Sequence, residues 1–400
     1  MNFKEGQKYR GDLKTSEQSN HNMSGESFDT LGIHANILRG VYGYGFEKPS
    51  QIQVKAIPEI IKGGDVVAQA QSGTGKTGAF TIGSLSRIDD TSQTTQVLIL
   101  TPTRELSEQV YTVVKEITGY TKITCVQCVG GTNVSLCSED LSRLPHVVIA
   151  TPGRAIDMIH RGKLATEFLK TVVMDEADEM LSQGFLESVQ TILKSVPKTS
   201  QICLFSATLP EEVLCLTSHF MNDPSQILVK HEELTLEGIQ QYFVNVKRSE
   251  WKYDVIVDLY DTISVNQCIV YINNKQRILE MYHRLCDNNF PVEYITGDRI
   301  GAERKEIMEQ FRSGQIRILL STDLLARGID IQQLSLVINY DLPREKETYI
   351  HRIGRSGRYG RKGVAINLVG DRDLEYLKHI ETYYDTKIEE MPANIADLVG

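Results

Sequence analysis

The chain has few of the features that mark a secreted or membrane protein. It holds only seven cysteines in 400 residues, an odd and low number that excludes a fully paired disulfide framework and favours a reducing compartment. No run approaches the roughly 18 apolar residues that a membrane-spanning helix needs. The first residues, 1–14, contain no apolar run, so we expect neither a secretory signal nor membrane association.

An excess of positive charge is also missing. The sequence has 43 basic and 52 acidic residues, a formal net charge of −9. A protein of this sign cannot attract nucleic acid through its bulk charge, so any polyanion must bind a local basic patch. Apolar residues make up 41% and charged residues 24%, which is typical of globular proteins with well-formed cores.

Residues 1–27 are polar, and we expect them to form a flexible tail. After them, short runs rich in Val and Ile alternate with helical stretches. Strands that are apolar on both faces predict parallel sheets covered by helices, an α/β fold. The predicted strands are 65–68, 96–100, 146–150, 171–174 and 201–205, followed by 267–272, 317–320 and 336–339.

A charged stretch without clear periodicity, 230–238, separates the two groups of strands. We interpret it as a linker between a first domain at 28–229 and a second at 239–400. Two parallel-sheet domains in tandem would leave a cleft between them.

A glycine-rich segment, Ala70–Thr77, follows the first predicted strand and begins a helix. Its glycines allow backbone N–H groups to turn toward phosphate oxygens, Lys76 can reach the β- and γ-phosphates, and Thr77 can ligate Mg²⁺. The alternative is a glycine-rich turn with a surface lysine. The order of strand, loop and helix favours the phosphate site, although Ala70 stands where the usual pattern has glycine.

Acidic residues, Asp175–Asp178, end another apolar strand. Asp175 can hold Mg²⁺ and Glu176 can polarise an attacking water. An acidic helix cap would show the same residues. Together with the phosphate loop, the pattern predicts Mg²⁺-dependent nucleotide hydrolysis.

A local basic patch lies at 344–362. This stretch contains seven basic and two acidic residues, a local charge of +5. Its centre, His351–Arg358, spaces arginines with glycines, so forked guanidinium groups can point at phosphate. A solvated basic helix is the alternative, but Gly354 and Gly357 would weaken such a helix.

These motifs, in this order, resemble those of the DEAD-box ATP-dependent RNA helicases, and the resemblance covers 28–400. Within that family the chain is similar to the eukaryotic translation initiation factor 4A group and to its exon-junction paralogue. The resemblance implies two RecA-like domains, ATP and Mg²⁺ as cofactors, and RNA as partner. Further matching segments are Gly45–Gln53 within a Q motif at 26–54, Pro102–Leu106, Gly130–Gly131, Thr151–Arg154, Ser206–Thr208, Thr322–Asp323 and Ala326–Asp330.

The resemblance implies a nucleotide site shared by both domains. Adenine would meet Phe46, Lys48 and Gln53. The phosphates and Mg²⁺ would meet Ser72, Gly73, Thr74, Gly75, Lys76, Thr77 and Asp175, with Glu176 as the base. From the second domain would come Asp330, Arg355, Ser356, Gly357, Arg358 and Tyr359, with Arg355 and Arg358 as catalytic fingers.

The resemblance also implies coupling and RNA-binding residues. Coupling would use Asp178, Ser206, Thr208 and His351. RNA-backbone contacts would come from Pro102, Thr103, Arg104, Gly131, Thr151, Arg154, Gly297, Asp298, Arg304 and Thr322. Backbone contacts carry no sequence code, so binding would be non-sequence-specific.

The chain departs from the family at Thr296, Arg299 and Gly301, where His, Met and Gln are usual. We expect these departures to alter the RNA surface of the second domain or a partner surface beside it. The cysteines Cys125 and Cys128 form a C-x-x-C, but no second pair at zinc spacing supports a metal role. Trp251 is expected to pack at the start of a helix.

The predicted activity is RNA-dependent ATP hydrolysis with local unwinding of short duplexes, in translation initiation at mRNA 5′ regions. An ATP-gated RNA clamp in mRNA processing and a DNA helicase on the same core are the alternatives. We expect a cytoplasmic monomer, or a nuclear protein if it is a clamp, with a possible scaffold partner of the initiation-factor type.

Overall fold

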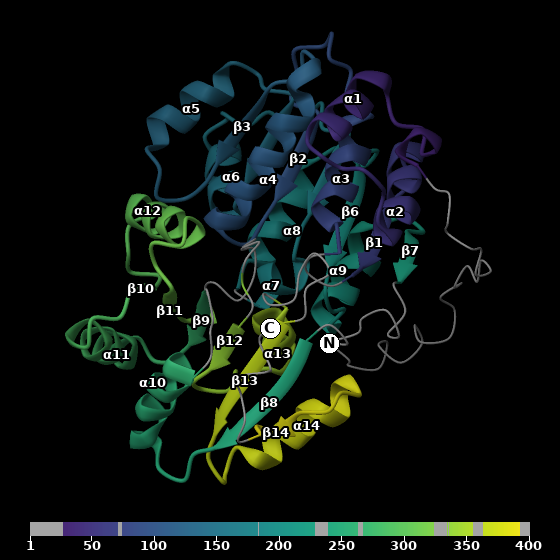
Figure 1. Ribbon diagram of the computed structural model, residues 1–400. Coiled ribbons are helices and arrows are strands. Elements are labelled where there is room, and N and C mark those ends of the chain that lie inside the picture. Colours follow the sequence, from purple (N-terminus) through teal and green to yellow (C-terminus); the bar gives the residue numbers. More distant parts are fainter. Residues whose placement is uncertain are drawn as a thin grey trace, which may run out of the picture.

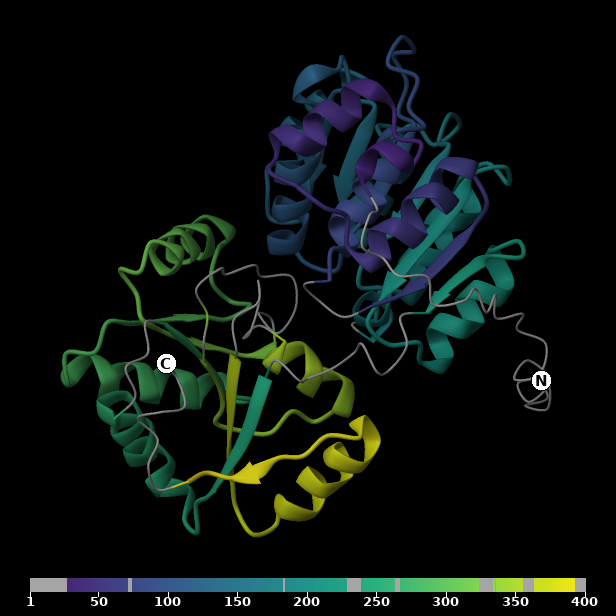
Figure 2. The ribbon, with the colours of Figure 1, turned by 45° about the vertical axis from the view of Figure 1, so that its right-hand side comes forward.

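The computed structural model describes residues 27–70, 74–182, 184–228, 239–262, 267–323, 334, 336–354 and 363–392. Within them the chain forms two α/β bodies, one above the other in Figure 1. Each body is built on a seven-stranded sheet whose neighbouring strands run parallel. Helices lie on both faces of each sheet, as Figure 2 shows. The predicted fold class is therefore confirmed.

The first sheet has the order β3-β4-β2-β5-β6-β1-β7. Its side chains alternate between two cores: Val66 and Ala68 face one, while Val67 faces the other. Burial on both faces is what the continuous apolar runs predicted. The strands are β1 Val66–Gln69, β2 Val97–Leu100, β3 Cys125–Cys128, β4 Val147–Ala150, β5 Thr171–Met174, β6 Gln201–Ser206 and β7 Ser225–Leu228.

The second sheet has the order β10-β11-β9-β12-β13-β8-β14. Its buried Asn367 donates to Tyr242 O at 3.0 Å and accepts from Asn339 at 2.9 Å, so a polar pair lies inside the apolar sheet. The strands are β8 Ile239–Asn245, β9 Cys268–Tyr271, β10 Val292–Ile295, β11 Ile318–Ser321, β12 Leu336–Asn339, β13 Gly363–Val369 and β14 Glu389–Glu390.

Several helices begin at a polar residue that accepts a backbone N–H. Thr103 accepts from Leu106 at 3.2 Å, and Asn133 accepts from Ser135 at 2.8 Å. The helices of the first body are α1 Ala35–Gly43, α2 Gln51–Lys62, α3 Lys76–Leu85, α4 Arg104–Ile117, α5 Val134–Ser142, α6 Pro152–His160, α7 Ala177–Ser182, α8 Leu186–Ser195 and α9 Glu211–Phe220. Those of the second are α10 Lys252–Thr262, α11 Lys275–Asp287, α12 Gly301–Arg312, α13 Lys346–Ile353 and α14 Leu374–Tyr384.

All eight predicted apolar runs are strands, with ends that shift by one residue at most. The strands β3, β7, β8, β10, β13 and β14 were not among the predicted runs. In β8 polar residues interrupt the pattern, and in β13 the buried Asn367 does so. The packing role expected of Trp251 was wrong, because its side chain is 47% exposed and α10 begins after it.

The proposed domain boundaries stay predictions. The first sheet ends at Leu228 and the second begins at Ile239, while the proposed linker 230–238 lies outside the described residues. At the other end, Ser27 accepts the Asp29 N–H at 3.3 Å and Phe28 is fully buried. Along the described stretches, none of the helices combines the length and apolar character needed to cross a bilayer.

The contact between α1 and the end of α4 leaves no room for a side chain at Gly40. A Cβ atom there would lie 1.9 Å from the carbonyl oxygen of Ile117. We therefore expect Gly40→Ala to lower the free energy of unfolding by about 1–3 kcal/mol, as overpacking does. Gly119→Ala is the matched control, since its Cβ would meet nothing within 4 Å. Urea unfolding followed by far-ultraviolet circular dichroism measures both, and equal midpoints would contradict the tight packing.

Candidate nucleotide and RNA site

The adenine-binding candidates lie where α2 packs on the start of α3. The Gln53 side chain is 3% exposed. Its Oε1 accepts the Ser50 N–H at 2.8 Å, and its Nε2 donates to Gly75 O at 3.2 Å. Because an amide oxygen has two lone pairs and an amide nitrogen two hydrogens, one acceptor and one donor position remain for a ligand.

The absence of a side chain at Gly78 allows the Gln53 side chain to pack against the start of α3. A Cβ on Gly78 would lie 2.5 Å from Gln53 Nε2 and 3.2 Å from the Phe46 ring. Phe46 lines the adjoining cavity together with Tyr44, which no sequence argument had singled out. The two rings lie 4.9 Å apart, so they form an aromatic wall. Lys48 is exposed and is not among the cavity's lining residues.

The phosphate-binding segment is described from Thr74 onward. Gly75 has a φ of 101°, a left-handed conformation that suits glycine, and α3 begins at Lys76. The Lys76 side chain is 6% exposed, and its Nζ has no hydrogen-bond partner among the described residues. Burying an ammonium group without a partner is costly, so this position fits an anionic ligand. Thr77 lines the same cavity.

The acidic motif lies at the carboxyl end of β5, facing Lys76. Asp175 accepts the Glu176 N–H at 3.0 Å, and both side chains are buried. Burial raises the pKa of Asp175 to about 7, while the charge of Lys76 opposes the rise. Glu176 has a φ of 49°, uncommon for a residue with a side chain and a source of local strain.

A magnesium ion fits this donor set if the nucleotide supplies the other ligands. Among the described residues, no three His, Cys, Asp or Glu side chains gather as a complete metal site. Mg²⁺ is usually held by one or two carboxylates together with phosphates and waters. Asp175 and Thr77 provide such a partial set, next to the unpaired Lys76 Nζ.

The predicted coupling residues converge on Asp178. Its Oδ2 accepts from Thr208 Oγ1 at 2.7 Å, and its N–H donates to Ser206 Oγ at 3.3 Å. From the second body, His351 Nε2 lies 3.4 Å from the same Oδ2. Asp178 and His351 are 4% and 1% exposed, so they meet in a buried contact across the two bodies.

The predicted RNA contacts gather around a groove of about 560 Å³. It lies between the first body and the loop before α12. Seven of the ten predicted RNA residues line it: Pro102, Thr103, Arg104, Thr151, Arg154, Gly297 and Arg304. Gly131 lines the neighbouring cavity, while Asp298 is exposed and paired with Lys275 at 2.8 Å. Thr322 is half-buried and lines neither of these two cavities.

Three guanidinium groups give this groove its charge. Burial, and next the nearby charge of Arg304, lower the pKa of Arg104. Arg154 donates to Thr132 Oγ1 at 3.2 Å and to Thr132 O at 3.0 Å. Among the described residues, Arg304 is the one of the three with a carboxylate partner, Glu105 at 2.9 Å. A cluster of this kind, in a protein of net charge −9, is the local patch that phosphate binding requires.

Besides Tyr44, two further residues escaped the sequence argument. Phe185, which precedes α8, lines the arginine groove and offers an apolar surface there. Arg352 was counted only as part of the basic patch. It is fully buried and donates to Asp323 at 2.6 Å, to Asn273 at 2.7 Å and to Asp341 O at 2.7 Å. No linear pattern signals either residue, because their partners lie far away in the chain.

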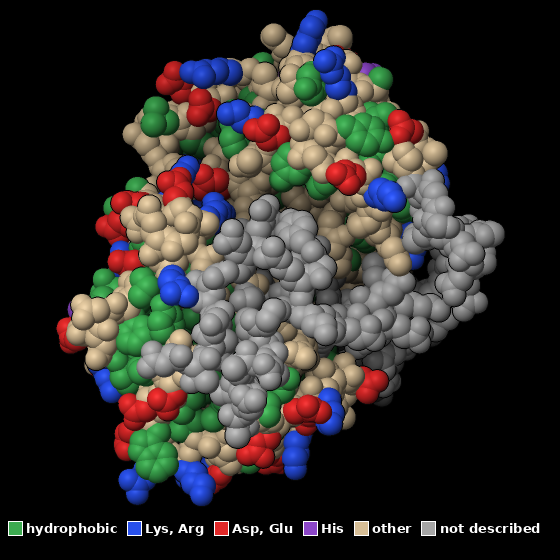
Figure 3. Space-filling view, in the orientation of Figure 1, with side chains coloured by type: hydrophobic (Ala, Val, Ile, Leu, Met, Phe, Trp, Pro, Cys, Tyr) green, Lys and Arg blue, Asp and Glu red, His purple; other side chains and the backbone are tan. Residues whose placement is uncertain are grey.

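A second cavity, of about 780 Å³, joins the nucleotide residues to the groove. Lys76, Asp175 and Glu176 line one part of it, and α12 of the second body closes the other. In Figure 3, acidic and basic side chains are interspersed over both bodies on the face shown.

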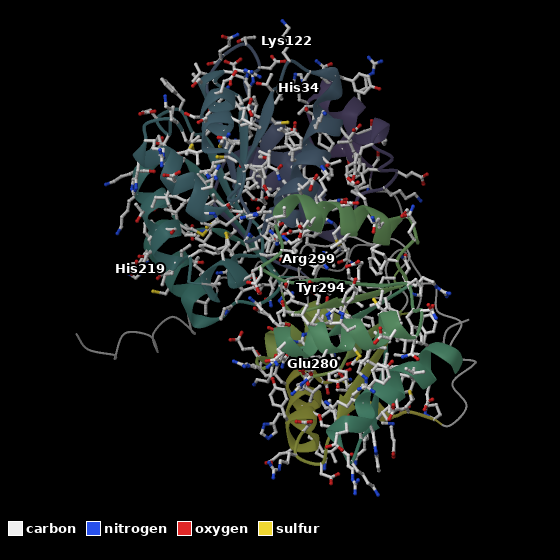
Figure 4. All side chains as sticks on the ribbon, turned by 90° about the vertical axis from the view of Figure 1, so that its left-hand side faces the viewer. His34, Lys122, His219, Glu280, Tyr294 and Arg299 are labelled. Carbon is white, nitrogen blue, oxygen red and sulfur yellow. The ribbon has the colours of Figure 1, made fainter. Side chains whose placement is uncertain are left out.

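The residues that depart from the family pattern make contacts within the second body and, at Gly301, with the first. Figure 4 shows Arg299 beside Tyr294. The Arg299 guanidinium lies 3.8 Å from the Tyr294 ring centre and donates to Glu293 at 3.0 Å. Thr296 is buried, and a Cβ on Gly301 would lie 3.3 Å from Arg104 Nη1. The missing side chain at 301 therefore leaves space that Arg104 approaches.

Part of the predicted nucleotide site lies outside the described residues. These positions are Ser72, Gly73, Asp330, Arg355, Ser356, Gly357, Arg358 and Tyr359. Their assigned roles stay predictions.

A two-body fold with this pair of sites matches known families. Residues 50–215 match the family DEAD/DEAH box helicase, and residues 251–360 match the helicase conserved C-terminal domain. The chain belongs to the DEAD-box RNA helicases, enzymes whose ATP hydrolysis depends on RNA. It is 53% identical over 381 residues to the ATP-dependent RNA helicase eIF4A of Eremothecium gossypii, covering 95% of this chain and 96% of that protein.

Two solved structures of one yeast protein bear on the arrangement of the bodies. S. cerevisiae Dbp5 bound to RNA and ADP BeF3 matches with a TM-score of 0.87 at 34% identity, over 93% of this chain and 97% of that one. A variant of Dbp5 bound to Nup159, Gle1, IP6 and ADP matches with a TM-score of 0.65 at 32% identity, over 92% and 97%.

The contact between α4 and α12 generates a prediction about closure. Lys305 on α12 and Glu108 on α4 lie 2.6 Å apart, one turn from the pair formed by Arg304 and Glu105. In Lys305→Glu two carboxylates would face one another, so we expect the KM for RNA in ATP hydrolysis to rise about two- to fivefold, the scale of an exposed ion pair.

The matched control exchanges the two charges. Glu108→Lys combined with Lys305→Glu should restore the KM, and 0.5 M salt should narrow the differences because it screens exposed charges. Equal KM values for the single variant and the parent at low salt would show that this contact plays no part in closure.

Proposed function

We propose that the chain is an ATP-dependent RNA helicase of translation initiation that unwinds short duplexes in mRNA 5′ regions. The observation that carries the proposal is the buried contact of His351 with Asp178 across the two bodies. It places the second body against the ATP-hydrolysing motif, while the arginine groove spans the same cleft. The 53% identity to a translation-initiation helicase supports the biological role.

RNA binding in this proposal uses the backbone of one strand. Arg104, Arg154 and Arg304 face the groove and would pair with phosphate oxygens through charge-assisted hydrogen bonds. Such contacts position a strand without reading its sequence. Gly297 and Thr151 border the groove with backbone groups and a short side chain, which leaves room for the sugar and its 2′-hydroxyl.

Nucleotide binding in this proposal uses the first body. Lys76 holds the β- and γ-phosphates, Gln53 meets the adenine edge, and Phe46 packs on the base. Thr77 and Asp175 would hold Mg²⁺, which supplies charge neutralisation of the phosphates when bound. Glu176 orients and deprotonates the attacking water, and Arg355 and Arg358 stabilise charge on the transferred phosphoryl group from the second body.

Coupling follows from the division of these groups between two bodies. The two bodies fit the RNA- and nucleotide-bound Dbp5 better than the Dbp5 variant bound to ADP, although the identity is nearly equal. That difference supports a closed arrangement of the bodies. Closure brings the arginine fingers to the nucleotide, and RNA that spans both bodies favours closure.

The alternatives have less support. An ATP-gated RNA clamp would use the same core, but the similarity to eIF4A favours unwinding in initiation. A DNA helicase is disfavoured for the same reason. Cytoplasmic location, a monomeric state and a scaffold partner of the initiation-factor type complete the proposal.

Two substitutions separate binding from hydrolysis. Lys76→Ala removes a phosphate contact, so nucleotide affinity should fall. Glu176→Gln keeps the side-chain shape but removes the base, so turnover should fall by roughly 10²–10⁴ while ATP and RNA still bind together. Phosphate release and fluorescence anisotropy of a labelled RNA measure both properties. Normal turnover in Glu176→Gln would refute the assignment of the base.

The preference for ATP over GTP tests whether Gln53 contacts the adenine base. Adenine offers a donor where guanine offers an acceptor, so a buried amide fits ATP and leaves unpaired groups with GTP, at a cost of roughly 1–3 kcal/mol. Gln53→Ala should therefore lower the ATP-to-GTP ratio of kcat/KM. Because Gln53 also bonds Ser50 and Gly75, its variant needs a folding control by thermal unfolding. A folded variant with an unchanged ratio would assign the amide to packing alone.

A further inference from the structure

Two thiols in the first body face one another without any role in the assigned sites. Cys128 ends β3 and Cys137 lies in α5, and their sulfur atoms are 2.8 Å apart. The residues are buried, at 0% and 5% exposure, and both thiols are free. Cys125, the other cysteine of the C-x-x-C, packs against the core on the opposite face of the sheet.

The segment between the two thiols, 129–136, builds one wall of the arginine groove. Gly130 lines the groove, and Thr132 accepts two hydrogen bonds from Arg154. Gly131 has a φ of 77°, and a Cβ there would lie 2.3 Å from the Arg104 guanidinium. The two arginines of the first body therefore depend on the shape of this segment.

The surroundings of the sulfur atoms distinguish the two residues. The hydrogen bond from Cys128, and after it the guanidinium of Arg154, lower the pKa of Cys137 to about 7 against the effect of burial. The pKa of Cys128 is raised by the same contact and by burial. Cys137 is the better placed nucleophile, because it is the less deeply buried thiol and the Arg154 guanidinium stabilises its thiolate.

We propose that Cys128 and Cys137 are a redox-modification site, at which hydrogen peroxide forms a reversible disulfide that weakens RNA binding. The Cys137 thiolate attacks one peroxide oxygen; the S–O bond forms, the O–O bond breaks, and hydroxide leaves. The Cys128 thiol then attacks the resulting sulfenic acid; the S–S bond forms, the S–O bond breaks, and its proton leaves with the oxygen as water. In total, two thiols and one peroxide give one disulfide and two waters.

The disulfide acts on RNA binding through Arg154. Reduced Cys137 offers this guanidinium a polar or anionic sulfur, whereas a disulfide sulfur is neutral and a weak acceptor. The bond also closes a ring around Gly130–Thr132, which restrains the wall of the groove. The catalytic residues Lys76, Asp175 and Glu176 lie outside the ring. We expect the KM for RNA to rise about two- to tenfold, the scale of one lost hydrogen bond, with kcat unchanged.

The first experiment follows the bond itself and does not depend on the proposed function. The full-length chain with Cys125→Ser is treated with hydrogen peroxide, unfolded and alkylated with iodoacetamide. Trypsin cleaves after Lys122 and Arg143, so one peptide holds both thiols. We expect this peptide to lose two alkylation sites and two hydrogens, faster as the pH rises through about 7, and to recover both sites after dithiothreitol. Recovery of both alkylated thiols after peroxide would overturn the proposal.

The second experiment rests on the proposed RNA-dependent ATPase activity. The KM for RNA is measured for the parent chain before peroxide, after peroxide, and after subsequent dithiothreitol. The double variant Cys128→Ser with Cys137→Ser receives the same treatments as the control. We expect a reversible rise in KM in the parent and none in the double variant. A disulfide that leaves KM unchanged, or an equal rise in the double variant, would overturn the link to RNA binding.

Discussion

One buried carboxylate, Asp178, connects the parts of this molecule. It lies at the start of α7, where it accepts a hydrogen bond from Thr208 of its own body and meets His351 of the other. A buried carboxylate needs such partners, because leaving its charge unpaired costs several kcal/mol. The first body contributes Thr208 and Ser206, and the second body adds His351, whose Nε2 lies 3.4 Å from Oδ2, so residues of both bodies meet at this one carboxylate.

The parallel topology explains why the sites lie together. In open parallel sheets the loops at the carboxyl ends of the strands meet along one edge. Asp175 follows β5 and Thr151 follows β4, while the phosphate segment follows β1. Residues that are far apart in the chain thus share one cleft, with Lys76, Asp175 and Glu176 at one part of it and the arginine groove at the other.

The local sequence was sufficient to predict the features that are formed by residues close together in the chain. Continuous Val and Ile runs identified the central strands, and the glycine-rich segment identified the start of α3. Features with long-range partners needed coordinates. Arg352 is buried and joins several loops, because Asn273 and Asp323 lie in two other loops. Phe185 lines the arginine groove together with predicted RNA-binding residues from four other stretches of the chain. The second hydrogen bond of Gln53, to Gly75, is likewise invisible in the sequence.

The backbone conformation of Glu176 lowers the stability of the fold. Its φ of 49° is a conformation that glycine adopts freely and that costs a residue with a side chain about 1–3 kcal/mol. A chain selected for thermal resistance alone would gain by carrying glycine there and would lose the buried carboxylate beside Asp175. Proteins tend to sit just above the stability they need, so such a local cost must be offset elsewhere, here by the two well-packed cores of the first body. Engineering of this enzyme for heat tolerance should therefore begin at positions remote from β5.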